Sequence, residues 1–138
     1  MEEPKSLSEI EEKYKESMSL GSDCASRFLS VSNQLHVWHW QVKNYSAHKA
    51  LGKLYEIITE FADSFVETAM RDGPVVKCIQ LDKPVDFEGM EYVNDYLTAQ
   101  INYAMEKKLM LSERPDLQNM IDEYIATLNG YKYKFTLK

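Results

Sequence analysis

The chain has 138 residues, of which 44% are hydrophobic and 28% are charged, and this composition and length are typical of one globular domain. Its net charge of -6 argues against a general nucleic-acid binder, because such a protein needs a basic surface. No apolar run approaches the roughly 20 residues that cross a bilayer. The charged N-terminus also lacks an apolar signal core, so we expect a cytoplasmic protein.

The first segment is predicted to be helical and acidic. Ser6 and Ser8 each stand three residues before a glutamate, which is a capping-box pattern for a helix start. Gly21 then interrupts the pattern, and the Ser-Asp pair after it offers a second cap. Residues 1–21 are therefore expected to form an N-terminal helical extension, which either stops near Leu20 or continues with a bend.

Two amphipathic helices follow, joined by a short connector at 44–46. The first is predicted from 23 to about 43, and the second from 46 to about 71, where Gly73-Pro74 stops it. So short a connector makes them antiparallel neighbours. Their predicted apolar faces are Cys24, Phe28, Val31, Leu35, Trp38 and Val42, then Leu51, Leu54, Tyr55, Ile58, Phe61, Ala62, Phe65 and Ala69.

The remainder of the chain predicts a crossover and a second helical hairpin. Residues 74–88 have no strand partner and are interpreted as a long crossover, of the kind that some four-helix bundles use. Helices are expected from about 88 to 111 and from 116 to 129, where Gly130 closes the bundle. Residues 131–138 are expected to form a short basic tail. The inner face of the third helix is predicted as Tyr92, Tyr96, Ala99, Tyr103, Leu109 and Met110.

Histidines and carboxylates are gathered in the first hairpin. His36, His39 and His48 are the three histidines of the chain, and Asp63 and Glu67 share one helical face. Such side chains bind zinc, iron or manganese. Because His48 and Asp63 are separated by roughly 22 Å of helix, one chain cannot bring them to one ion. A shared site would need a second chain, whereas ordinary core histidines and a solvated acidic face would explain the same residues without metal.

The pattern HxxHWxVK, a further histidine and YxxxxxxxDxxxE resembles the Dps miniferritins, the DNA-protecting proteins of starved cells. The resemblance implies a ferritin-like bundle with an intersubunit di-iron ferroxidase site, formed by two histidines of one chain and an Asp and a Glu of its twofold mate. The matching residues are His39 and His48, then Asp63 and Glu67, with His36 one turn earlier and Trp40 beside the iron site as a candidate catalytic electron donor.

By this resemblance the protein would bind two Fe(II) ions, with zinc or manganese as possible substitutes, and oxidise them with peroxide or oxygen. It would be a homo-oligomer, at least a dimer, with the family's dodecameric shell as the leading form. Lys49, Gly52 and Lys53 stand where the family carries the acidic residues that nucleate its mineral core, so mineral storage is not expected. The N-terminal arm, which is lysine-rich in DNA-binding members of the family, is acidic here, so DNA binding is not expected. The alternative is a catalytically inactive ferritin-like module for assembly or interaction, docking through its acidic N-terminal helix.

The two cysteines give no pattern of their own. Cys24 and Cys78 lie far apart without CxxC spacing, so neither a disulfide framework nor a zinc knuckle is predicted. We expect both to be reduced and partly buried thiols.

Overall fold

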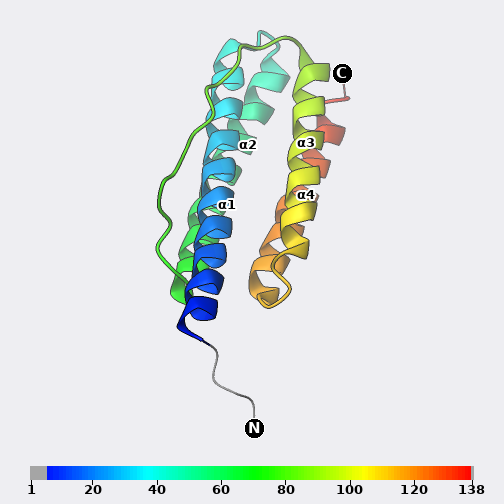
Figure 1. Cartoon of the computed structure of the whole chain (residues 1–138). Helices are drawn as coiled ribbons and strands as arrows, with labels where there is room; N and C mark the ends of the chain where they lie inside the picture. The colour runs from blue at the N-terminus through cyan, green and yellow to red at the C-terminus, as the bar shows by residue number, and fades with distance from the viewer. Residues whose placement is uncertain (1–5, 138) are drawn as a thin grey trace.

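The computed structural model describes residues 6–137, and for residues 10–19 it describes the backbone alone. It contains the helices α1 (Leu7–Gln41), α2 (Tyr45–Arg71), α3 (Met90–Leu109) and α4 (Pro115–Lys134). Figure 1 shows α1 and α2 as one antiparallel hairpin, which packs beside the hairpin of α3 and α4. Within residues 6–137 no strand forms, so the all-α bundle with a crossover between its second and third helices is confirmed. No helix among these residues has the length and apolar character to span a bilayer.

Helix α1 is longer than predicted because it runs unbroken through Gly21. Ser6 caps it by accepting a hydrogen bond from the Glu9 amide at 3.3 Å. The expected second cap does not form, since Ser22 and Asp23 use their side chains for bonds to other elements. A helical glycine costs only about 1 kcal/mol, and the turns after Gly21 are held by buried Cys24 and Phe28, so the glycine does not end the helix. Residues 7–21 are thus continuous with the bundle rather than a separate extension, while residues 1–5 lie outside the described part.

The apolar faces predicted for the first hairpin are confirmed. All six predicted residues of α1 are buried, and so are five of the eight in α2, the other three being half-buried. Phe28 lies at the centre of an aromatic cluster, with ring centroids 4.9 Å from Phe61 and 5.2 Å from Phe65. Buried Leu35 and Trp38 of α1 and Leu51 of α2 belong to the same core nearer the connector, and this packing positions the end of α1 against the start of α2.

The residues predicted to form the inner face of α3 are displaced by about one position along the sequence from the residues that α3 actually buries. The residues that α3 buries are Val93, Leu97, Gln100, Ile101 and Ala104, whereas Leu109 is 79% exposed. The tyrosine stripe is amphipathic, and it lies at the edge of the core instead of in its centre. Tyr96 illustrates this, because it is only half-buried and its ring meets the fully buried Trp38 ring edge-on, with centroids 5.1 Å apart.

Helix α4 continues past Gly130 to Lys134, so the predicted boundary at 130 is also wrong. Tyr131 is 8% exposed and extends the buried stripe of Leu117, Ile121, Tyr124 and Leu128 by one more turn. Burial of an aromatic ring contributes more than a glycine costs. The residues expected to form a basic tail therefore begin inside the bundle.

The crossover is an extended strap that runs along α1 (Figure 1), and it has no helical turn. Ten extended steps from Lys77 to Phe87, about 33 Å, cover the nineteen helical steps from Ser22 to Gln41, about 28 Å. Five strap amides donate to α1 side chains, and the acceptors recur about every fourth residue. These acceptors are Ser22, Ser26, Ser30, Gln34 and Gln41. A stripe of polar side chains on α1 thus accepts hydrogen bonds from the amides of the strap, which has no neighbouring strand to pair with.

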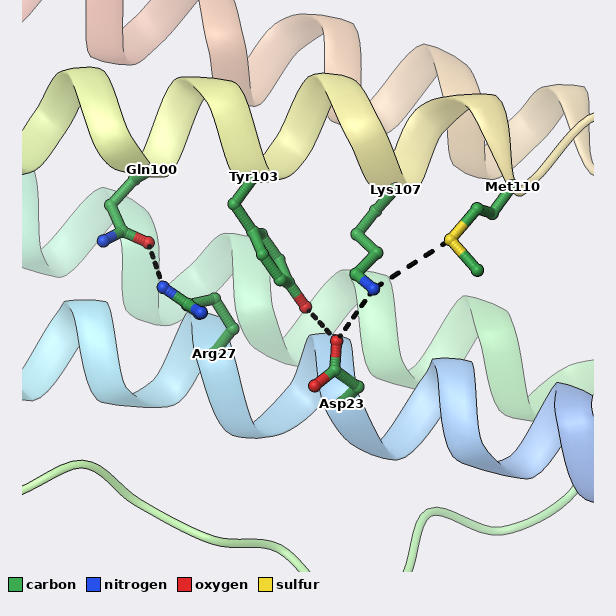
Figure 2. Close-up of polar contacts among 6 residues, drawn as sticks. All are labelled: Asp23, Arg27, Gln100, Tyr103, Lys107 and Met110. Carbon is green, nitrogen blue, oxygen red and sulfur yellow. Dashed lines mark hydrogen bonds and ion pairs between the residues drawn. The ribbon is translucent and has the colours of Figure 1, made fainter.

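The seam between α1 and α3 is closed by polar side chains (Figure 2). Asp23 accepts a hydrogen bond from the Tyr103 hydroxyl at 2.6 Å and pairs with Lys107 at 3.3 Å. Arg27 donates to Gln100 at 3.4 Å and lies over the Tyr103 ring, 4.3 Å from its centroid. Burial alone would raise the pKa of Asp23, but the tyrosine hydroxyl and the lysine lower it below its ordinary value.

Candidate metal centre

The two central histidines of the predicted site lie face to face across the first hairpin. His39 occupies the last turn of α1, and His48 the first turn of α2, which Asn44 caps by accepting from the Ala47 amide. Their ring centroids are 3.9 Å apart, and the ring planes are inclined by 16°. Both residues are half-buried. Antiparallel packing of the hairpin therefore brings this predicted pair together.

Each histidine of the pair is held by a hydrogen bond to the backbone of the other. His39 Nδ1 lies 2.6 Å from the His48 carbonyl oxygen, and His48 Nδ1 lies 2.7 Å from that of His39. A carbonyl only accepts, so both Nδ1 atoms donate a proton. In the neutral rings the lone pair is then on Nε2, the atom that a metal would bind.

Gly52 makes this arrangement possible, and the sequence analysis missed it. A Cβ atom at this position would lie 2.7 Å from Cε1 and 2.9 Å from Nδ1 of His39. A Cβ atom essentially never lies within 3.0 Å of another residue's side chain, so the His39 ring can occupy this place only against the bare backbone of a glycine. The sequence comparison registered Gly52 only as a missing acidic residue. The usable signal was its position, four residues after His48 on the face of α2 that meets α1.

His36 and Trp40 belong to an aromatic group beside the pair. The His36 ring stacks on Tyr55 with centroids 3.9 Å apart and planes inclined by 13°, and it lies 4.4 Å from the Trp40 ring. Its centroid is 6.3 Å from that of His39. Trp40 is 66% exposed, so it lies at the surface of this group instead of in the core. Tyr55, which was predicted only as an apolar-face residue, is the platform on which His36 rests.

The two carboxylates are not part of this arrangement within one chain. Asp63 and Glu67 are both exposed, further along α2. Across the described residues no group of three or more His, Cys, Asp or Glu side chains is placed to hold a metal ion. One chain thus contributes an imidazole pair at one end of α2 and a carboxylate pair toward the other. A complete ligand set of this kind would need two chains.

Comparison with known proteins gives a single family. The family model matches residues 39–135, which is more than half of the chain and begins at His39 itself. No curated protein and no solved structure matches significantly. The matched range contains both predicted ligand pairs, Gly52, the strap and the second hairpin, whereas most of α1 lies before it. The chain belongs to a family of unknown function, DUF5856.

Proposed function

We propose that this protein is a Dps-like iron-oxidising protein whose reaction centre lies between two chains. The observation that carries the proposal is the reciprocal pair of hydrogen bonds between His39 and His48. Both bonds fix the ring orientation and the tautomer, and both leave Nε2 free for a ligand. This is the support that metal-binding histidines receive from a neighbouring carbonyl.

The donor set suits Fe(II) as the substrate. Two neutral imidazoles from one chain would meet the carboxylates of Asp63 and Glu67 from a twofold-related copy, and such mixed nitrogen and oxygen ligands bind Fe(II). Zinc and manganese accept the same ligands and would compete for the site. Both carboxylates are exposed and so are available to a neighbouring chain.

The proposed reaction is the oxidation of Fe(II) to Fe(III) by hydrogen peroxide or oxygen. Two Fe(II) ions lose one electron each, and these two electrons, with two protons, reduce one peroxide to two waters. Removing peroxide and Fe(II) together would limit hydroxyl-radical damage. Trp40, whose ring centroid is 4.4 Å from that of His36, would supply an electron when only one Fe(II) is bound. His36 would act as an orienting residue for the site.

A shared centre requires at least a dimer, and the dodecameric shell of the Dps family is the form we propose. The net charge of -6 makes binding to duplex DNA at physiological salt weak or absent. A cytoplasmic location would agree with Fe(II) as the substrate.

The decisive test is to rebuild the site from two defective chains. A His39→Gln/His48→Gln chain and an Asp63→Asn/Glu67→Gln chain should each lose saturable Fe(II) binding under anaerobic conditions and fast oxidation on adding peroxide. Mixing them should restore part of both, because one of the two mixed centres keeps all four ligands. A Glu106→Gln/Glu123→Gln chain, altered at exposed acids of α3 and α4, is the matched control and should behave as the wild type.

An inactive assembly module is the second candidate, and one observation favours it. The same reciprocal bonds also close the α1–α2 hairpin without any metal. If the mixed protein assembles but stays as inactive as either parent, the intersubunit centre is excluded. The two histidines would then serve only to join α1 and α2 through their reciprocal hydrogen bonds.

A further inference from the structure

The outward face of α2 carries its charges in two blocks of opposite sign. Lys49 and Lys53 are exposed near its start. Four exposed acidic residues continue the same face, namely Glu56, Glu60, Asp63 and Glu67, and exposed Arg71 follows them in the last turn. The ion pairs formed between described residues all lie elsewhere, at Lys107–Asp23, Lys108–Asp122 and Arg114–Asp116. The face is therefore polarised along the helix axis, and its charges are not paired within the chain's described part.

Such a face is complementary to itself when two copies run antiparallel. Place a twofold axis beside the midpoint between Tyr55 and Glu56. Residue 49 then faces position 62 of the partner, one residue from the partner subunit's Asp63. Residue 53 faces position 58, two residues from both the partner subunit's Glu56 and the partner subunit's Glu60. Two residues correspond to about 3 Å along a helix, which is within reach of a lysine side chain.

The same axis satisfies a second, independent requirement. It places residue 48 opposite position 63, so that His48 meets the partner subunit's Asp63. Several neighbouring positions of the axis would pair the lysines with the acidic block, and this position is the one that also brings His48 to the partner subunit's Asp63. A parallel arrangement would instead place lysine beside lysine and acid beside acid, which is repulsive. The charge blocks therefore select the antiparallel direction, and the metal ligands select the register within it.

We propose that this face of α2 is the contact between two copies of the chain, antiparallel about a twofold axis beside Tyr55 and Glu56. The proposal deepens the function proposed above, since it names the partner and the surface that would complete the metal centre. A twofold contact uses one patch on both subunits, so each lysine pairing occurs twice. Half-buried Ile57 and Phe61 flank the charged face and would add apolar contact area.

Charge reversal tests the contact without touching any predicted ligand. One variant is Lys49→Glu/Lys53→Glu, which replaces both lysines of this face with acids, and the other is Glu56→Lys/Glu60→Lys. The native mass of each metal-free protein is measured by analytical ultracentrifugation over a range of concentrations. We expect the wild type to form dimers or larger assemblies, and each variant alone to dissociate with its Kd raised on the order of 100-fold. An equimolar mixture should associate again, because the two altered faces complement each other.

Two controls carry the same change of net charge on other surfaces. Lys132→Glu/Lys134→Glu at the end of α4 and Asp95→Lys/Glu106→Lys on α3 should both assemble as the wild type does. The proposal is overturned if the wild type is monomeric, if the α2 variants assemble normally, or if mixing them restores nothing.

The two proposals fail separately. Charge-dependent assembly without Fe(II) binding would leave this contact standing and refute the iron chemistry. Restored iron oxidation in mixed ligand variants, together with no effect of charge reversal, would support the iron chemistry and refute this contact.

Discussion

Replacing Gly52 with alanine tests whether the His39 ring lies where the hairpin places it. An alanine inside a helix usually stabilises a protein relative to glycine by about 1 kcal/mol. At Gly52 the new methyl group would meet the His39 ring at 2.7 Å, so the ring must turn aside. Turning the ring breaks the hydrogen bond from His39 Nδ1 to the His48 carbonyl, which costs about 1 kcal/mol. Overpacking of the hairpin around the displaced ring costs about 1–3 kcal/mol more.

The net expectation for Gly52→Ala is a loss of about 1–3 kcal/mol in the free energy of unfolding. Gly130→Ala is the matched control, because Gly130 is also helical and a Cβ there meets no atom within 4 Å. That variant should gain about 0.5–1 kcal/mol. Urea denaturation followed by circular dichroism measures both values on the same scale, and imidazole N–H resonances in NMR spectra report directly whether the hydrogen bond persists.

The test depends on whether Gly52→Ala lowers the free energy of unfolding while Gly130→Ala raises it. If Gly52→Ala stabilises the protein as much as Gly130→Ala and keeps both imidazole N–H resonances, the His39 ring does not lie on Gly52. The geometry described for the histidine pair would then be wrong.

Three further outcomes are expected elsewhere in the chain. Because partners across the α1–α3 seam lower the pKa of Asp23, the stability it contributes is present above its unfolded pKa and is lost as pH falls through the folded value. Asp23→Asn should therefore reduce this part of the acid dependence, and equal pH profiles would contradict it. Gln34→Ala should cost about 2 kcal/mol and speed amide exchange at Val85, because the Gln34 side chain bonds both backbone groups of Val85. In the folded protein a thiol reagent should modify exposed Cys78 quickly and spare Cys24, which is 1% exposed. Burial also raises the pKa of the Cys24 thiol to about 11, so little reactive thiolate is present. Equal rates of modification at the two cysteines would show that α1 opens.

The periodicity of apolar residues was sufficient to predict the first hairpin. Its two helices bury a 3.6-residue pattern almost continuously, and the Asn-Tyr-Ser connector is too short for any but an antiparallel arrangement. The pattern was insufficient in α3, where a stripe of tyrosines competes with the aliphatic stripe that is actually buried. It also failed at Gly130, because a local preference of about 1 kcal/mol is smaller than the packing energy of the buried turns on either side, which hold Leu128 and Tyr131.

The exposure of Cys78 is a related case, since the prediction that both thiols are partly buried is wrong for it. Its place in the strap depends on bonds from α1 to residues more than fifty positions later in the chain. Nothing in the local sequence around Cys78 encodes those bonds.

The sequence by itself determined that one chain could not bring the proposed ligands His48 and Asp63 together, because helix rise sets a distance between them that no side chain can span. Only the tertiary structure decided how the histidines are held. The reciprocal carbonyl bonds, the bare backbone at Gly52 and the platform of Tyr55 all depend on the orientation of α1 against α2. Sequence spacing specifies which turns of two helices can meet, but the rotation of each helix about its axis is fixed by the packing of the whole core.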